Sequence, residues 1–127
     1  MRVLVIDDDS DILEYYSALM ETEGLTYYSA LSGGKAIDIL GQKDIDIILL
    51  DLAMDEINGI DLCRLIKENP VTAHIPIIIV SARIEEQTKN SAYEAGASYY
   101  ITKPFRGDFL ISKIYELIKS SNLKKNV

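Results

Sequence analysis

Short runs rich in Val, Ile and Leu alternate along the chain with longer segments that carry apolar residues on one helical face. The runs at 3–6, 45–50 and 77–80 are apolar almost throughout, as buried strands are. Residues 25–30 and 98–102 predict two further strands of more polar character. After each run the apolar spacing changes to that of a helix, and glycine or proline ends the pattern. The expected helical stripes lie at 12–20, 36–40, 60–66, 84–95 and 110–118.

This alternation predicts an α/β fold in which helices cover both faces of a parallel sheet. Strands covered on both faces are apolar throughout, so we expect the three apolar strands in the middle and the two polar ones at the edges. That distribution fits the flavodoxin-like order 2-1-3-4-5, a (βα)5 three-layer sandwich. In this topology the ligand site lies at the carboxyl ends of the strands, beside the switch point.

Length and composition limit the classes of protein to consider. A chain of 127 residues is long enough for one domain with its own core. Its net charge of −7 argues against nucleic acid or an anionic membrane as the main partner. The single cysteine, Cys63, cannot form an internal disulfide and is typical of a reducing cytosol. No signal peptide or membrane-spanning run is visible, so we expect a soluble, cytoplasmic domain.

Polar residues follow four of the expected strands at the edge where a ligand site is predicted. Asp7 and Asp8 follow the first strand, Asp51 the third, Ser81 the fourth and Lys103 the fifth. Three carboxylates in one crevice repel one another unless a cation intervenes, and a hard divalent cation with oxygen ligands is suited to this role. Mg²⁺ and the lysine together balance the three negative charges. With one histidine and one cysteine in the chain, a zinc or copper site is not expected.

A carboxylate beside Mg²⁺, a hydroxyl and a lysine has the composition of a phosphoryl acceptor site. The carboxylate of Asp51 is the candidate nucleophile, and the metal ion and ammonium group would neutralise the phosphoryl oxygens. The alternative is that each polar group is solvated separately at the end of its own strand. The convergence of four strand ends at one edge favours the shared site.

The motifs at these strand ends resemble those of the receiver domain of bacterial two-component response regulators. The resemblance covers the chain from Val3 to about Ser120. It implies that Asp51 accepts a phosphoryl group from the phosphohistidine of a sensor histidine kinase or a phosphotransfer protein. The matching segments are 5–9, 50–54, 58–59, 80–83 and 100–105.

The resemblance also implies a metal site and a switch. Asp8 would bind Mg²⁺ directly and Asp7 through water, with Asp51 and the backbone carbonyl of Ala53 as further ligands. Among the remaining matches, Ser81 corresponds to the switch hydroxyl, Tyr100 to the switch aromatic and Lys103 to the lysine that contacts the phosphoryl group. Pro104 stands where a cis peptide bond is common in this family.

Several positions depart from the family pattern. Asp55 replaces a usual proline, so a looser acceptor loop is expected, and Asn58 replaces a common aspartate. Asp9 adds a third acid, for which a helix N-cap is the preferred interpretation. Ala53 and Arg83 occupy variable positions that tune the lifetime of the phosphoaspartate in the family. Our hypothesis is that Arg83 reaches over the phosphoryl group and slows its hydrolysis.

The resemblance divides the chain into a receiver domain at 1–120 and a basic C-terminal tail or start of a linker at 121–127. Phosphorylation is expected to shift the surface of the fourth helix, fifth strand and fifth helix toward an unknown downstream protein or output domain. Kinase docking is expected on the first helix, around Ile12, Leu13 and Tyr16. Because Ser98-Tyr99 replaces the acidic pair of charged receiver dimers, we expect a monomer or a weak homodimer.

Two other function classes stay open. A Mg²⁺-dependent phosphatase of the haloacid-dehalogenase type also has aspartates after its first strand, but Asp11 stands where its first motif requires threonine or valine. No late acidic motif follows Lys103. A pseudo-receiver would bind partners without phosphate, against which the full acceptor set argues. We expect a regulatory phosphoacceptor domain and not an enzyme.

Overall fold

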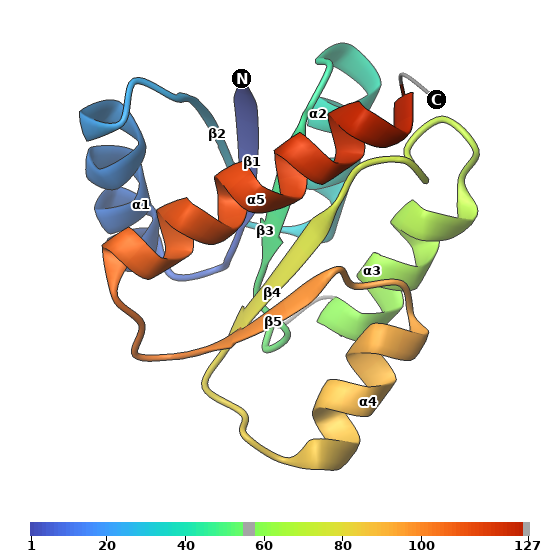
Figure 1. Cartoon of the computed structure of the whole chain (residues 1–127). Helices are drawn as coiled ribbons and strands as arrows, with labels where there is room; N and C mark the ends of the chain where they lie inside the picture. Colours follow the sequence, from blue (N-terminus) through green and yellow to red (C-terminus); the bar gives the residue numbers. More distant parts are fainter. Residues whose placement is uncertain (55–57, 126–127) are drawn as a thin grey trace.

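The computed structural model describes residues 1–54 and 58–125, with side chains described through residue 122. Strands and helices alternate along this part of the chain, and the strands form one parallel sheet in the order β2-β1-β3-β4-β5 (Figure 1). The predicted flavodoxin-like fold is therefore confirmed. The elements are β1 (Arg2–Ile6), α1 (Ser10–Thr22), β2 (Thr26–Ala30), α2 (Gly33–Gln42), β3 (Ile47–Leu50), α3 (Gly59–Glu68), β4 (Ile77–Ser81), α4 (Glu86–Glu94), β5 (Tyr99–Thr102) and α5 (Gly107–Lys125).

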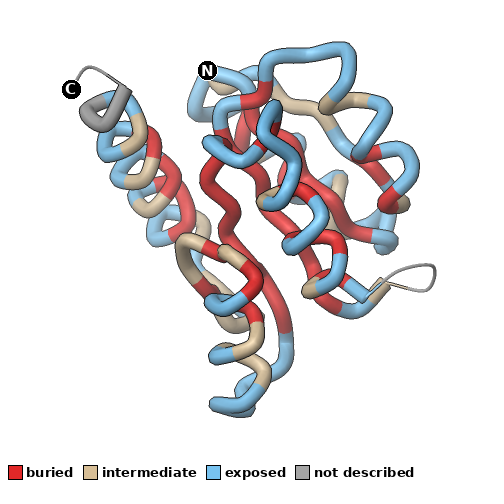
Figure 2. The backbone as a smooth tube through the Cα atoms, turned by 90° about the vertical axis from the view of Figure 1, so that its right-hand side faces the viewer, coloured by how far each residue is buried: buried red, intermediate tan, exposed pale blue. Residues whose placement is uncertain are grey.

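The strands form the middle of three layers. Successive side chains of a strand point to opposite faces of the sheet, so Val3 and Val5 face one helical layer while Leu4 and Ile6 face the other. Helices α1 and α5 cover the first face, and α2, α3 and α4 cover the second (Figure 1). The strands are buried along most of their length, whereas each helix is buried only on the side turned to the sheet (Figure 2).

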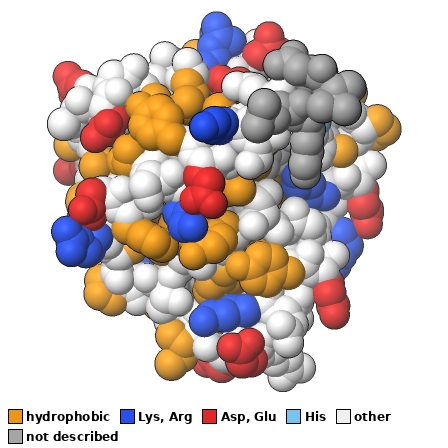
Figure 3. Space-filling view, viewed as in Figure 1, with side chains coloured by type: hydrophobic (Ala, Val, Ile, Leu, Met, Phe, Trp, Pro, Cys, Tyr) orange, Lys and Arg blue, Asp and Glu red, His pale blue; other side chains and the backbone are white. Residues whose placement is uncertain are grey.

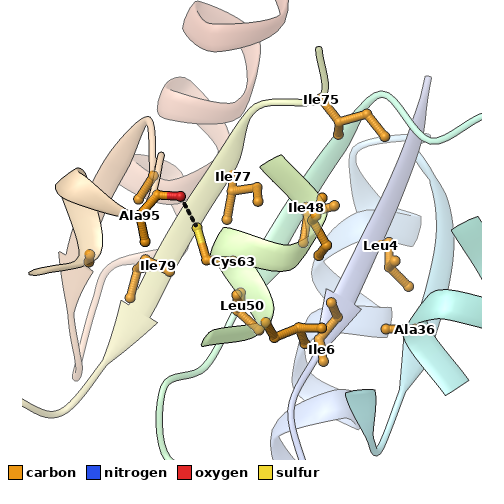
Figure 4. Packing of buried hydrophobic residues seen from close by; sticks show 14 of the residues in the cluster. Leu4, Ile6, Ala36, Ile48, Leu50, Cys63, Ile75, Ile77, Ile79 and Ala95 are labelled. Atoms are coloured by element: carbon orange, nitrogen blue, oxygen red, sulfur yellow. Dashed lines mark hydrogen bonds between the residues drawn. The ribbon is translucent and has the colours of Figure 1, made fainter. Parts of the chain in front are cut away.

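The second face shows how tightly the layers pack. Leu4, Ile48 and Ile77 from three strands belong to one buried cluster with Cys63 of α3, which lies on the β4 side of it (Figure 4). The thiol of Cys63 is fully buried and lies 3.7 Å from the carbonyl oxygen of Ala95, and burial raises its pKa to about 11. Cys63 is thus a core side chain.

Most strand boundaries differ from the sequence prediction by one residue, and larger differences occur at β3, α4 and α5. Strand β3 begins at Ile47 and not at residue 45, although Asp46 already contacts β1: its carboxylate accepts from the amide of Arg2 at 2.7 Å and its amide donates to the carbonyl of Arg2 at 2.9 Å. Helix α4 is shorter than the predicted stripe. Helix α5 continues to Lys125, so the first part of the segment predicted as a tail is helical. The division of the chain at residue 120 stays a prediction.

Side-chain caps begin three of the helices. Asp9 accepts from the amide of Asp11 at 3.0 Å, which confirms it as the N-cap of α1. Ser32 caps α2 through the amide of Lys35, and Asn58 caps α3 through the amide of Ile60. The chain therefore enters α1 and α3 directly beside the carboxyl ends of β1 and β3.

Gly59, the first residue of α3, is required by close packing against the backbone. A Cβ atom at this position would lie 2.5 Å from both the carbonyl oxygen of Asp51 and the Cα of Leu52. We expect Gly59→Ala to lower the free energy of unfolding by about 1–3 kcal/mol, because the obstructing atoms are backbone. Urea denaturation measures this change.

Gly34 in α2 is the matched control, because a Cβ there meets nothing within 4 Å. Gly34→Ala is expected to stabilise the domain by about 0.5–1 kcal/mol through helix propensity. Equal effects of the two substitutions would contradict the close-packing argument.

Candidate functional site

The register of the sheet brings four strand ends to one edge. Ile6 pairs with Leu50, so the residues that follow them, Asp7 and Asp51, are neighbours. The ladder continues past the strands: the amide of Asp51 donates to the carbonyl of Ile6 at 3.0 Å, and the amide of Lys103 donates to the carbonyl of Ser81 at 2.8 Å. These backbone bonds fix the starting points of the polar side chains.

Asp7, Asp8 and Asp51 form an acidic cluster. Each offers a carboxylate oxygen, and these atoms lie within 4.8 Å of one another. Oxygen ligands of one Mg²⁺ lie about 2.1 Å from the ion and hence up to about 4.2 Å apart, so small side-chain shifts would suffice to surround it. Asp8 is exposed, whereas Asp7 is 2% and Asp51 9% exposed. The donor set fits a hard divalent cation.

Lys103 lies between the two buried carboxylates. Its Nζ is 3.2 Å from Oδ2 of Asp7 and 3.9 Å from Oδ2 of Asp51, so the ammonium group is closer to Asp7. The amide of Ala53 makes a long contact of 3.4 Å to Oδ1 of Asp51. One lysine therefore lies among three carboxylates, and its ammonium group interacts more weakly with Asp51 than with Asp7.

The surroundings of Asp51 shift the pKa of its carboxyl. Burial raises the pKa of its carboxyl above the ordinary value of 3.8, and the charge of Asp7 raises it further. Lys103 and the amide of Ala53 oppose these effects, while Asp8 adds to them. A cation bound among the carboxylates would offset the repulsion that contributes to this raised pKa.

Ser81 and Tyr100 meet on the backbone of Arg83. The hydroxyl of Ser81, 1% exposed, accepts from the amide of Arg83 at 3.2 Å. The hydroxyl of Tyr100, whose ring is buried, donates to the carbonyl of Arg83 at 2.8 Å. Nζ of Lys89 lies 5.8 Å from the centre of the Tyr100 ring.

The exposed side chain of Arg83 lines a groove of about 290 Å³ between the acceptor loop and α4.

One expectation about helix α1 is wrong. Tyr16 was expected at a docking surface, but its ring is 1% exposed and packs in the core. Tyr15 is the exposed neighbour, at 45%. Phe105 stacks on Tyr16, a contact that sequence spacing does not reveal because the two residues are far apart in the chain. Asp55, the expected cause of a looser acceptor loop, lies outside the described residues.

The fold and the acidic site together define a doubly wound α/β domain of the kind that receives phosphoryl groups on a carboxylate. The family profile of the response regulator receiver domain matches residues 3–115. The chain belongs to this family, and it is a regulatory receiver domain of a two-component response regulator.

Relatives and solved structures agree with this assignment. The heme response regulator HssR of Staphylococcus aureus (strain bovine RF122 / ET3-1) is 34% identical over 126 residues, which are 99% of this chain and 55% of that protein. The chain thus spans about half the length of the curated relatives it matches.

Among solved structures, the receiver domain of the Francisella response regulator 1452 is 30% identical, with a TM-score of 0.87 and coverage of 94% of this chain and 98% of that chain. A CheY-like receiver from Methanospirillum hungatei JF-1 shares the fold, with a TM-score of 0.91 at 24% identity and coverage of 97% of both chains. Within residues 1–54 and 58–125, no helix has the length and apolar character needed to cross a membrane.

Because the pKa of Asp51 is raised, we expect that replacing its carboxyl group with a neutral amide stabilises the protein by an amount that depends on pH. Because the folded state binds this proton more tightly than the unfolded state, the stability that Asp51 contributes is present below 3.8 and lost as pH rises through its raised pKa. Asp51→Asn should therefore raise the midpoint of thermal unfolding at pH 7 in metal-free buffer, by roughly 2–8 °C for each kcal/mol gained. The gain should shrink as the pH falls through that range.

Asp8→Asn is the matched control, because Asp8 is exposed. It should produce a much smaller gain. A gain for Asp51→Asn that is the same at pH 7 and pH 4 would contradict the assigned cause.

Proposed function

We propose that Asp51 is the phosphoacceptor of this receiver domain and that its phosphorylation switches the α4-β5-α5 surface. The observation that carries the proposal is the convergence of a buried carboxylate, two further acids and a lysine at one sheet edge. A simple structural ion pair balances one positive charge against one negative charge. Here one ammonium group faces three carboxylates.

The transfer is a displacement at phosphorus. A carboxylate oxygen of Asp51 forms the new O–P bond, and the P–N bond of a phosphohistidine breaks. The imidazole leaves with the electron pair of that bond and with a proton on its second nitrogen. Lys103 neutralises charge on the phosphoryl oxygens, and its 3.9 Å distance from Asp51 leaves it within reach of a group attached there.

Asp7, Asp8, Asp51 and the carbonyl of Ala53 would hold Mg²⁺. The metal ion would supply neutralisation of the phosphoryl oxygens and of the carboxylate repulsion. For the attack, the carboxylate of Asp51 must be ionised and present a free oxygen. Lys103 lies closer to Asp7 than to Asp51, at 3.2 Å against 3.9 Å, which leaves an oxygen of Asp51 for the attack.

Ser81 and Tyr100 would carry the signal from the site to the surface. When the hydroxyl of Ser81 turns to the phosphoryl group, it releases the amide of Arg83, whose carbonyl holds Tyr100. Helix α4 favours such a shift, because Ala92 is its one buried residue and it has no side-chain N-cap hydrogen bond. On the face that α5 crosses, apolar patches lie among charged side chains of both signs (Figure 3).

The partners we propose are a sensor histidine kinase or phosphotransfer protein, and a downstream protein or output domain. A monomer or weak homodimer is proposed because Lys113, the basic residue available for a charged dimer, is engaged within its own chain. Its Nζ lies 3.1 Å from Glu116 and 4.6 Å from the centre of the Tyr99 ring. A pseudo-receiver is the second candidate, and it would bind neither Mg²⁺ nor beryllofluoride.

Phosphorylation by a small donor tests the acceptor directly. With Mg²⁺ and acetyl phosphate, we expect one phosphoryl adduct, measured by intact mass and located on Asp51 by peptide mapping. Asp51→Asn should abolish it, while Asp9→Asn, which changes the α1 cap, should keep it. An adduct that persists in Asp51→Asn would overturn the assignment.

Arg83 is predicted to prolong the lifetime of the phosphoaspartate. If its guanidinium shields the phosphoryl group from water and so raises the barrier to hydrolysis by about 0.7–1.4 kcal/mol, the phosphoaspartate of Arg83→Ala should hydrolyse about three- to tenfold faster. The decay of purified phosphoprotein measures this rate. Arg64→Ala removes an exposed arginine paired with Asp61 and should leave the rate unchanged; an unchanged rate in Arg83→Ala would refute the hypothesis.

A further inference from the structure

We propose that Tyr16 and Phe105 are positioning residues for Lys103: their stacked rings hold the β5–α5 loop against α1 and so set the approach of the ammonium group to the acidic site. The proposal rests on the proposed function, because it assigns a role in phosphoryl transfer at Asp51. It assigns a positioning role to Tyr16, which was expected at a docking surface but is buried.

The ring stack is the first observation. The centroids of Tyr16 and Phe105 lie 5.9 Å apart with an interplanar angle of 17°. Offset stacks in this range contribute about 0.5–1.5 kcal/mol beyond the area they bury. Tyr16 belongs to α1, whose N-cap Asp9 follows the acidic pair directly, and Phe105 follows Lys103 by two residues. The stack therefore joins the segment that carries the acids to the segment that carries the lysine.

A second, independent contact holds the same loop. Tyr15 packs edge-on against Phe105 with centroids 6.0 Å apart at 71°. Two residues later, a Cβ on Gly107 would lie 3.0 Å from the hydroxyl of Tyr15 and 3.1 Å from Cδ1 of Leu19. The backbone at the start of α5 thus lies flush against α1, and three side chains of one helix bracket the loop.

Lys103 is consequently fixed from both sides. Its amide is bonded to the carbonyl of Ser81 on the strand side, and Phe105 anchors the chain on the loop side. Between these anchors its Nζ reaches 3.2 Å from Asp7 and 3.9 Å from Asp51. Displacement of a catalytic group by about 1 Å can cost roughly 100-fold in rate, so the loop anchor matters to transfer.

The surroundings of the phenol agree with this role. Burial raises the pKa of Tyr16, and the charges of Asp7 and Asp51 raise it further. The phenol therefore stays neutral and acts through its ring, as a packing surface within the electrostatic reach of the acids. Tyr16→Phe should preserve this function, whereas Tyr16→Leu removes the aromatic face.

The test measures the rate of Asp51 phosphorylation by acetyl phosphate and, separately, the affinity for Mg²⁺ by calorimetry. Tyr16→Leu should slow phosphorylation about tenfold, a fraction of the roughly 100-fold loss for a 1 Å displacement. Tyr16→Phe should retain the rate, and Mg²⁺ affinity should be unchanged in both. Tyr115→Leu, which removes an exposed aromatic residue of α5, is the matched control.

A double-mutant cycle separates positioning from a general loss of stability. In a Lys103→Ala background, Tyr16→Leu should cause no further slowing, because the group that it positions is gone. The same slowing in both backgrounds, or a wild-type rate in Tyr16→Leu, would overturn the proposal. If Tyr16→Leu does not fold, Phe105→Leu removes the same stack from the half-buried side and decides between the same outcomes.

Failure of the two proposals can be told apart. A wild-type protein that is not labelled on Asp51 would overturn the proposed function. A wild type labelled normally, with Tyr16→Leu unslowed, would overturn the positioning role alone.

Discussion

The burial of Asp51 beside Asp7 is the constraint on which the site depends. A parallel sheet brings the carboxyl ends of its strands to one edge, and here the pairing of Ile6 with Leu50 places two buried carboxylates next to each other. Both carboxylates are largely shielded from water, so positive charge within the protein must offset their repulsion. The ammonium group of Lys103 offsets the negative charge of Asp7 at 3.2 Å and, less fully, that of Asp51 at 3.9 Å. The site therefore has a deficit of positive charge centred on Asp51.

That deficit explains why neighbouring segments are built as they are. The acids follow β1 without a spacer, so α1 must begin at once, and Asp9 caps it. The lysine must reach the acids from β5, and its loop is held against the same helix by the stack of Phe105 on Tyr16. Helix α1 thus contacts both the segment that carries the acids and the segment that carries the lysine, so its packing affects the electrostatics of the site.

Much of this fold could be predicted because covered parallel strands are apolar on both faces, a pattern that a linear sequence displays. The convergence of Asp7, Asp51 and Lys103 followed from topology, since the end of a strand has one place in the sheet. Contacts between side chains could not be predicted in the same way. Periodicity assigned Tyr16 to an apolar stripe, but its partner Phe105 lies near the other end of the chain. The preference of Lys103 for Asp7 is likewise a matter of tenths of an ångström.

The backbone of Arg83 links the site to the surface by simple geometry. Its amide is held by Ser81 and its carbonyl by Tyr100, so both switch candidates share one residue. A rotation of the Ser81 hydroxyl toward Asp51 must give up the first bond, and the residue that positions Tyr100 then loses an anchor. No long chain of contacts is needed, because the second bond lies on the same residue. The side chain of Arg83 is exposed, so the effect we propose for it on the phosphoryl group can be tested separately from the coupling we propose through its backbone.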